Sequence, residues 1–429
     1  MAVELPPAQA HADEGSGLRH EELRAAAAPA EKAGGSGAAN PRVRRVATCT
    51  APYWGKRDEE LLLPTNSSLS VTLSQDQLCT RTTAAASPEF KGRRLWLNGK
   101  EQPVDGDRRL TACLEELVRC RRRLEESRQR EARGRKPEAP EAAAGGGGGG
   151  AAAGAPDGAC RLSEFGLRIC SENNFPTAAG LASSASGFAC LVYAVARLYE
   201  LTPGVLSLTD LSRIARRGSG SACRSLFGGF VAWRMGTRAD GEDSEAAQVA
   251  DERHWPELEV LVLVASSRKK HTSSTLAMRK AVETSWLLRH RAEEVVPRRM
   301  AEMERAVLAK DFPTFARLTM LDSDNFHAVC ADTQPRICYL SDASEAVMQV
   351  IRHLNDQGGD GPVAAYTFDA GPNPVIYAPR DNIPRVLDAI FRHFPKADNA
   401  ADHDFFANPY NVQRPRLSSP EAPPPGDLP

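Results

Sequence analysis

The chain has 429 residues, enough for two domains or for one large domain with irregular tails. A composition of 41% hydrophobic and 25% charged residues is typical of a globular protein, and a formal net charge of −1 gives no electrostatic reason to expect a nucleic-acid or membrane partner. No apolar run approaches the roughly 20 residues that a membrane helix needs. The ten cysteines lack metal-ligand spacing, so reduced thiols and a cytoplasmic (cytosolic) location are expected.

Three stretches contain few large apolar side chains. They are residues 1–45, an insert at 131–159 with six consecutive glycines, and the tail 396–429. Such segments cannot bury enough surface to offset the entropy of ordering, so both tails are predicted to be disordered and the insert to be a flexible linker. The N-terminal region is then predicted to span 46–230 and the C-terminal region 231–395.

The first predicted elements are strands. Apolar residues that alternate over 69–73 predict a half-buried strand, and the apolar residues 95–97 before Asn98-Gly99 predict a strand that enters a hairpin. A helix with a basic, solvated face is predicted over 108–133, and residues 161–172 alternate again.

The elements predicted after residue 180 include most of the helices. An Ala-rich helix buried on most sides is expected over 181–198. The later elements are, in chain order, a buried strand at 258–265, four or five helices between 272 and 357, strands at 363–370 and 374–378 around a Gly-Pro-Asn turn, and a helix at 383–394. Strands, then helices, then strands and a helix indicate an α+β fold rather than regular βαβ alternation.

The first segment whose residues suggest a binding or catalytic role runs from Asn173 to Ala185. It reads N-N-F-P-T-A-A-G-L-A-S-S-A. It joins a predicted strand to an apolar helix through small residues, and the free N–H groups at a helix start suit phosphate. Hydroxyls at Ser183 and Ser184 add ligands for phosphate or Mg²⁺. The alternative is a tight loop in which serine caps a core helix.

The second segment, residues 217–229, is rich in glycine and serine around Arg224, whose guanidinium suits a two-pronged bond to carboxylate or phosphate. In isolation, an arginine in a flexible turn is more often a surface residue. The third segment, residues 366–373, places Asp369 between an apolar strand and a glycine turn, where it suits a general base or an orienting group. A turn former is the alternative for that aspartate.

Taken together, these segments resemble the mevalonate diphosphate decarboxylase family of the GHMP kinase superfamily. The stretches that carry the resemblance, over roughly residues 46–130 and 160–395, are Y-W-G-K-R-D from Tyr53, N-S-S-L-S-V-T-L from Asn66, L-W-L-N-G from Leu95, N-N-F-P-T-A-A-G-L-A-S-S from Asn173, R-R-G-S-G-S-A-C-R-S-L-F-G-G from Arg216, H-W-P-E-L from His254 and Y-T-F-D-A-G-P-N from Tyr366. The resemblance implies a GHMP-kinase-like fold of two α+β layers that meet in a deep cleft, commonly as a homodimer.

The resemblance also implies an activity. Members of the family convert mevalonate 5-diphosphate and ATP, with Mg²⁺, into isopentenyl diphosphate, ADP, phosphate and carbon dioxide, a step of isoprenoid and sterol biosynthesis. The tertiary 3-hydroxyl of the substrate is a poor leaving group, and its phosphorylation by ATP makes a good one. Loss of phosphate and of the carboxylate then forms the double bond, while the protein positions the groups and stabilises charge.

The resemblance implies the following site residues. Asp369 would be the base or orienting group at the 3-hydroxyl, and Arg224 would hold the substrate carboxylate. The ATP phosphate loop would run from Pro176 to Ser184, with Ser184 reaching the metal. Residues implied to bind the substrate are Tyr53, Trp54, Gly55, Lys56, Arg109, Ser219, Gly220, Ser221, Ala222, Cys223, Arg224 and Thr275; the ATP loop comprises Pro176, Thr177, Ala178, Ala179, Gly180, Leu181, Ala182, Ser183 and Ser184.

Two departures from the family pattern stand out. The family reads A-P-V-N-I-A-x-x-K-Y-W-G-K, but Ala51-Pro52 leads directly into Tyr53. We therefore expect a shortened or displaced cleft strand without its asparagine and lysine ligands. The glycine-rich terminal strand of the family is also missing after Asn399, which would leave a sheet edge unpaired.

Three hypotheses remain from the sequence. The first is a working decarboxylase, shown in an altered splice form or gene model. The second is a non-catalytic product that binds nucleotide or a partner, and the third is a GHMP small-molecule kinase that stops at phosphoryl transfer.

Overall fold

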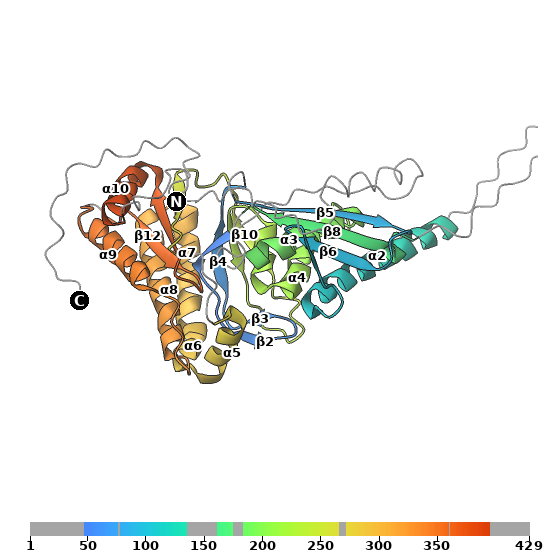
Figure 1. The fold of residues 1–429 in the computed structure, drawn as a ribbon, viewed down its shortest axis with the longest axis horizontal. Coiled ribbons are helices and arrows are strands. Elements are labelled where there is room, and N and C mark those ends of the chain that lie inside the picture. The colour runs from blue at the N-terminus through green and yellow to red at the C-terminus, as the bar shows by residue number, and fades with distance from the viewer. Residues whose placement is uncertain are drawn as a thin grey trace, which may run out of the picture.

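The computed structural model describes residues 47–75, 78–134, 161–174, 183–265, 272–359 and 361–394. The two tails and nearly all of the insert lie outside these residues, so the predictions made for them are not tested. Figure 1 shows a long molecule with helices and sheets at both ends and β4 and β10 between them. The α+β fold class is confirmed.

One end of the molecule consists of a four-stranded sheet covered by three helices. In spatial order the strands are β5 (Thr80–Ser87), β8 (Gly166–Asn173), β6 (Arg93–Leu97) and β7 (Lys100–Gln102), and the helices are α2 (Arg108–Gly134), α3 (Ser183–Leu198) and α4 (Leu208–Gly218). The predicted hairpin is confirmed, because β6 pairs with β7 across Asn98 and Gly99, which have φ values of 48° and 77°. Apolar faces of α2, α3 and α4 share one core cluster with this sheet.

The central sheet has the order β1 (Ala47–Ala51), β4 (Ser68–Thr72), β9 (Phe230–Trp233) and β10 (Ala246–Ala250). The half-buried strand predicted over 69–73 is corrected, because Ser68 and Ser70 are as fully buried as Leu69. The serines alternate with apolar residues yet face the protein interior, where Ser68 accepts a hydrogen bond from Arg224. Hydropathy alone cannot distinguish such a buried polar face from a solvated one.

The sheet retains an edge strand at the point where the family segment is missing. β1 pairs with β4 from Ala47 to Ala51, and a register shift lies between Cys49 and Ala51. A bulge of this kind bends a strand and redirects its side chains. The Cys49 carbonyl also accepts a hydrogen bond from Thr367 Oγ1 at 3.3 Å. The loss of two polar ligands from this strand stays a prediction.

The other end of the molecule combines a three-stranded sheet with helices. The strands, in spatial order, are β11 (Leu258–Val262), β13 (Pro374–Pro379) and β12 (Ala365–Phe368), and the helices are α5 (Ser274–Thr284), α6 (Trp286–His290), α7 (Val296–Ala309), α8 (Phe312–Asp332), α9 (Asp342–Asp356) and α10 (Ile383–His393). The predictions of four or five helices, two late strands and a final helix are confirmed.

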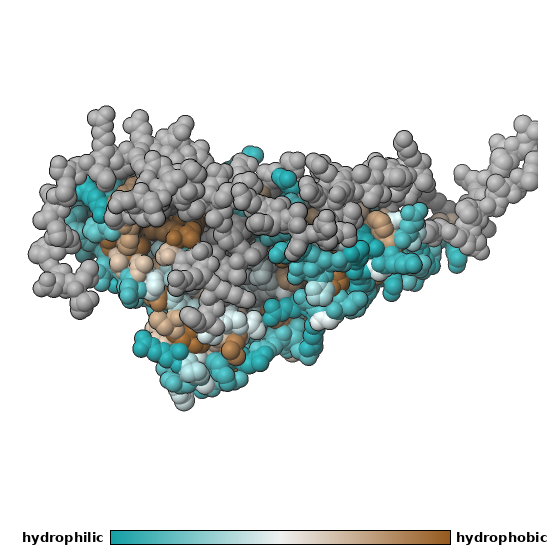
Figure 2. All heavy atoms as spheres, in the orientation of Figure 1, coloured by the Kyte–Doolittle hydropathy of each residue, from teal (hydrophilic) through white to brown (hydrophobic). Residues whose placement is uncertain are grey.

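The buried strand predicted at 258–265 is corrected to a partly exposed edge strand, β11. Within the described part of the chain, β11 and β12 each pair only with β13, so this sheet has two edges. The terminal strand of the family would fall after Asn399, outside the described residues, so its predicted absence is not tested. Figure 2 shows a hydrophilic surface at the end of the molecule that contains α2, a helix in which arginines are interspersed with glutamates.

Candidate active site

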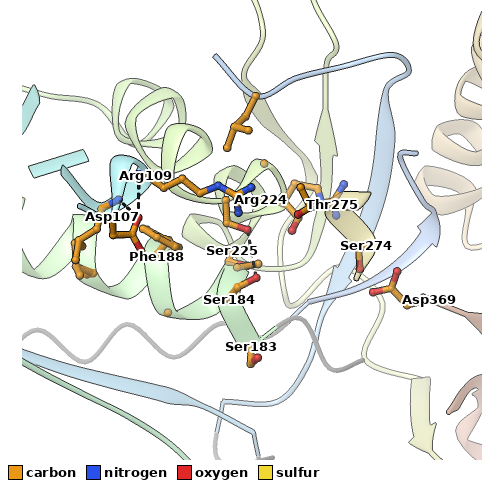
Figure 3. Close-up of a pocket in the computed structure, with 18 of the residues that line it drawn as sticks. Asp107, Arg109, Ser183, Ser184, Phe188, Arg224, Ser225, Ser274, Thr275 and Asp369 are labelled. Atoms are coloured by element: carbon orange, nitrogen blue, oxygen red, sulfur yellow. Dashed lines mark hydrogen bonds between the residues drawn. The ribbon is translucent and has the colours of Figure 1, made fainter. Parts of the chain in front are cut away.

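A cavity of about 640 Å³ opens between the two ends of the molecule. Its walls come from β1, the β2–β3 hairpin (Lys56–Asp58 and Leu63–Pro64), the starts of α2, α3 and α5, the 3₁₀ segment η2 (Gly220–Leu226) and the residue after β12. In the view of Figure 3, Asp369, Ser274 and Thr275 lie on one side, Arg109 lies on the other, and Arg224 lies between them. The cavity therefore gathers groups that are far apart in the sequence.

Arg224 is buried at the centre of this arrangement, with only 2% of its surface exposed. Its guanidinium donates to Ser68 Oγ and, at 2.8 Å, to Cys49 Sγ, and its carbon lies 6.0 Å from the centre of the Trp233 ring. Its Nε has no partner among the described residues. The prediction of a flexible turn is corrected, because residues 220–226 form a buried 3₁₀ segment. A surface role for Arg224 is excluded.

Tyr53 lines the cavity together with Arg224. Its ring packs edge-on against Trp233 with centroids 4.7 Å apart. Burial raises the pKa of its hydroxyl well above the usual range, and Arg224 offsets this only in part. Tyr53 is therefore a neutral hydrogen-bond donor at physiological pH.

Hydrogen bonds to its backbone hold the segment after Tyr53 in place. The Trp54 N–H donates to Asn66 Oδ1 at 3.2 Å, and the Trp54 carbonyl accepts from Thr65 Oγ1 at 2.5 Å. Gly55 has φ of +85°, and a Cβ there would meet Val282 at 2.9 Å. Only glycine combines this left-handed conformation with such close packing. The turn then directs Lys56 towards the cavity.

Lys56 and Arg109 both line the wall of the cavity and form a cationic region there. Burial, followed by the positive charge of Arg109, lowers the pKa of the Lys56 ammonium. Partly desolvated cations that repel one another gain most when an anion binds between them. The region therefore suits a multiply charged anion such as a diphosphate.

The start of α3 faces the same cavity. Ser183 and Ser184 are its first two residues, and both line the wall. Ser184 Oγ lies 3.4 Å from Ser219 Oγ, so the helix start lies close to η2. The start of a 16-residue helix offers unpaired N–H groups and the positive end of its dipole to a phosphate.

Asp369 follows β12 and lines the opposite wall, where its carboxylate is exposed to the cavity. Its charge raises the pKa values of both Cys49 and Tyr53, although burial is the larger cause for each. The negative charge of Asp369 and the positive charge of Arg224 therefore both affect the region around Cys49 and Tyr53. A carboxylate and a guanidinium placed in this way can bind and polarise a hydroxy acid.

The structure assigns the predicted site residues to three groups. Gly55, Ala222 and Cys223 lie behind the wall rather than in it, since Ala222 and Cys223 belong to the buried core. The loop residues Pro176 to Ala182 lie outside the described residues. The predicted residues that line the cavity are Tyr53, Trp54, Lys56, Arg109, Ser183, Ser184, Ser219, Gly220, Ser221, Arg224, Thr275 and Asp369. Their individual roles stay predictions.

Several lining residues were not predicted. Cys49 enters the wall through the pairing of β1 with β4, which no local pattern reveals. Asp107 accepts the N–H of Arg109 at 2.9 Å and caps the start of α2. Ser274 adjoins the predicted Thr275, and Asn173 opens the small-residue motif, so both had a signal in the sequence.

The donor set also bears on a metal ion. Among the residues that the structure describes, no group of three or more His, Cys, Asp or Glu side chains could hold one. Mg²⁺ prefers oxygen ligands, keeps several waters and commonly binds through phosphate oxygens with one or two protein ligands. The hydroxyl of Ser184, at a helix start that suits a phosphate, fits that pattern.

The framework of sheets and helices, and its similarity to solved structures, define this molecule as a protein with the GHMP kinase fold. Residues 46–246 match the family model of the diphosphomevalonate decarboxylase-like N-terminal domain, and residues 260–421 match that of the mevalonate 5-diphosphate decarboxylase C-terminal domain. The chain belongs to the diphosphomevalonate decarboxylase family. The second match reaches residue 421, beyond residue 395, where the resemblance was expected to end.

Individual relatives agree with this assignment. The human diphosphomevalonate decarboxylase is 53% identical over 359 residues, which cover 82% of this chain and 81% of the human protein. A crystal structure of mevalonate 5-diphosphate decarboxylase is similar with a TM-score of 0.72 at 43% identity, covering 89% of this chain and 91% of the other. The structure of MDDEF in complex with MVAPP, AMPPCP and magnesium gives a TM-score of 0.64 at 30% identity, with coverages of 84% and 94%.

Proposed function

We propose that this chain catalyses the ATP-dependent decarboxylation of mevalonate 5-diphosphate to isopentenyl diphosphate, ADP, phosphate and carbon dioxide. The family supplies the reaction, and one observation in the structure carries the proposal for this chain. Arg224 and Asp369, from distant segments, line the same cavity and both act on Tyr53 and Cys49. No finding favours the alternatives of a small-molecule kinase or a non-catalytic binder.

Asp369 would act at the 3-hydroxyl of the substrate. Its carboxylate is exposed to the cavity, so it can accept a hydrogen bond from the hydroxyl and orient the oxygen towards the γ-phosphoryl group of ATP. The proton of the hydroxyl would pass to the Asp369 carboxylate as the bond from the 3-oxygen to the γ-phosphorus forms and the bond from that phosphorus to ADP breaks. The ester is a better leaving group than the hydroxyl.

Arg224 would hold the substrate carboxylate. Ser68 and Cys49 fix its guanidinium, while Tyr53 places a neutral hydroxyl nearby. When the C–O bond to phosphate breaks, positive charge grows at the tertiary carbon, and the electrons of the breaking C–C bond form the double bond as carbon dioxide leaves. A rigid, buried cation orients the carboxylate for this step without reorganisation of its own.

ATP would bind at the other side of the cavity. The start of α3, with Ser183 and Ser184, would face its phosphates, and Ser184 would supply a hydroxyl to Mg²⁺, which neutralises phosphate charge when bound. An apolar part of the cavity suits the adenine base; it is lined by Leu95, Leu97, Pro103, Leu110, Phe188 and Leu191.

The substrate diphosphate would bind the cationic region at Lys56 and Arg109, with Thr275 and the hydroxyls of Ser219 and Ser221 as further donors. This orientation places the anionic diphosphate and the carboxylate on separate cations. A single arginine would otherwise compete for both groups.

We further propose a cytosolic homodimer in isoprenoid and sterol biosynthesis. The nine cysteines that the structure describes are all free thiols, which supports a reducing compartment. Among the described residues, no helix is both long and apolar enough to cross a membrane. The proposed regions remain 46–230 and 231–395, with separate tails.

A phosphorus NMR time course tests the proposal. The purified full chain is mixed with ATP, Mg²⁺ and mevalonate 5-diphosphate, and the products are identified by their phosphorus resonances. We expect ADP, phosphate and isopentenyl diphosphate to appear together. A stable phosphorylated intermediate would favour the kinase alternative, and unchanged substrate would favour the non-catalytic one.

A further inference from the structure

A buried ion pair lies outside the cavity, between α8 and the π-helical turn η3 (Arg291–Val295). Arg291 is fully buried and Asp322 is 1% exposed. The guanidinium grips the carboxylate with both nitrogens, Nη1 to Oδ1 at 2.9 Å and Nη2 to Oδ2 at 2.6 Å. Single π-helical turns within helical segments are often found at functional sites.

Arg291 also reaches the wall of the active site. Its Nη2 donates to the carbonyl of Pro52 at 2.9 Å, and its Nη1 donates to Asn325 Oδ1 at 2.6 Å. Pro52 lines the cavity and immediately precedes Tyr53. The same carbonyl lies 3.4 Å from the side-chain nitrogen of Asn66, which donates to it. The backbone that presents Tyr53 is therefore fixed from two sides.

Helix α8 makes a second contact with the catalytic wall. One residue after Asp322, Ser323 Oγ accepts the N–H of Phe368 at 3.1 Å, and Phe368 immediately precedes Asp369. One helix thus holds the backbone beside Asp369 directly and the backbone beside Tyr53 through Arg291. The two contacts arise from adjacent residues of α8, so they set the spacing of the two segments across the cavity.

The use of an arginine and an aspartate at this buried position indicates a role in positioning the backbone, and not only in stabilising the fold. A buried ion pair gains little over a well-packed apolar pair, because desolvation of both charges is costly. Arginine can serve four acceptors in one plane here, whereas a lysine ammonium is a point charge with three donors. Arg299, which also donates to Asp322 Oδ1 at 2.9 Å, keeps the carboxylate oriented.

We propose that Arg291, held by Asp322, is a positioning residue for the decarboxylation. Arg291 fixes the Pro52 carbonyl to α8, and the same helix fixes Phe368. Arg291 thereby sets the distance between Tyr53 and Asp369 across the cavity. The inference rests on the proposed function, because its kinetic test measures decarboxylation. It assigns Arg291 no contact with substrate.

Two variants of the full chain test the proposal. In R291K the charge remains, but a point donor cannot serve Asp322, Asn325 and Pro52 together. We expect kcat to fall by roughly 10- to 100-fold, because small misplacements of reacting groups cost that much, while KM for ATP changes less than about twofold. The double variant R291M/D322L replaces the ion pair with apolar side chains and is expected to stay folded but keep the low kcat.

A buried pair far from the cavity supplies the matched control. Arg121 and Glu125 on α2 form an ion pair at 2.8 Å and are 8% and 9% exposed. We expect R121M/E125L to lower the melting temperature without changing kcat. If R291M/D322L instead restored wild-type kcat, or if the control lost as much kcat at equal stability, the positioning role would be refuted.

Hydrogen–deuterium exchange gives a readout that does not need activity. In R291K we expect the amides of residues 53–56 to exchange at least about tenfold faster, with little change in α2 and β5–β8. Uniform acceleration, or none at 53–56, would overturn the proposal. An unsubstituted chain without activity would refute the proposed function, and the exchange result would still decide the positioning role.

Discussion

At the scale of single residues, Arg224 shows how its partners determine what a side chain can do. Ser68 and Cys49 occupy its terminal nitrogens, Trp233 lies against it, and almost none of it is exposed. The guanidinium therefore has little freedom to lose when a carboxylate binds. Such a preorganised cation is worth most when the charge it meets changes during the reaction.

Replacement of Arg224 by lysine tests this role. R224K keeps a positive charge but loses the planar fork, so we expect kcat/KM for mevalonate 5-diphosphate to fall by about 10²-fold while KM for ATP changes little. Steady-state kinetics with each substrate varied in turn measure both values. An equal loss for both substrates would indicate general damage to the cavity instead.

Asp369 gives a second prediction at this scale. D369N removes the acceptor charge but keeps the shape, so we expect kcat to fall by about 10²- to 10⁴-fold with substrate binding retained. Product formation and calorimetric binding check the two parts. D381N, at an exposed carboxylate after β13, is the control and should match the unsubstituted chain. Undiminished turnover by D369N would remove Asp369 from the reaction.

At the scale of elements, η2 depends on the absence of a side chain at Gly220. A Cβ there would lie 2.8 Å from the Trp233 ring and 3.1 Å from the Tyr53 hydroxyl. Because Trp233 and Tyr53 also pack against each other, a methyl group at position 220 would displace both rings from the wall of the cavity together. The glycine is thus part of how η2 presents Arg224.

A pair of glycine substitutions tests this packing. We expect G220A to raise KM for mevalonate 5-diphosphate and to lower the melting temperature. Gly187 lies within α3 and lines the cavity, and a Cβ there meets nothing within 4 Å, so G187A should raise the melting temperature and stabilise the chain by about 0.5–1 kcal/mol. Kinetics and thermal unfolding of both variants check the contrast. A normal KM for mevalonate 5-diphosphate in G220A would show that close packing at Gly220 does not position the substrate.

Much of the fold could be predicted from the sequence where a local pattern coincides with the structure. The hairpin at Asn98-Gly99 and the helix that became α2 are set by turn chemistry and composition. Long-range burial could not be predicted in this way. Ser68 faces the interior because Arg224 reaches it from η2, and β1 lines the cavity through its pairing with β4.

The candidate site shows the same limit. Arg224 looked like a turn residue in isolation, and only the order of several motifs, which resembles one family, pointed to its role. Cys49 and the Arg291–Asp322 pair had no such signal, since neither lies in a quoted motif. Their importance arises from partners more than 30 residues away, which no local pattern contains.

At the scale of the whole molecule, buried thiols link stability to pH. Burial raises the pKa of Cys49 to about 11 and the pKa values of Cys113, Cys223 and Cys330 to about 12, from an ordinary value of 9.0. Above pH 9 the unfolded chain releases these protons while the folded chain retains them. The folded state is therefore fully favoured below pH 9 and loses stability as pH rises towards 11 to 12.

Urea unfolding at pH 7.5, 9 and 10 checks this linkage. We expect the midpoint urea concentration to fall between pH 9 and 10, and to fall less in C113A/C330A, which lacks two of the four thiols. The decrease should be reversible when the pH is lowered. An equal pH dependence in both proteins would show that other groups cause the loss.

The stoichiometry of carbon dioxide released to ADP formed tests the central claim, that this cavity couples phosphoryl transfer to decarboxylation. The full chain is incubated with ATP, Mg²⁺ and mevalonate 5-diphosphate labelled at its carboxyl carbon, and both products are counted over time. The account predicts one carbon dioxide for each ADP, and loss of both products together in D369N. ADP without carbon dioxide, or no ADP from the unsubstituted chain, would contradict it.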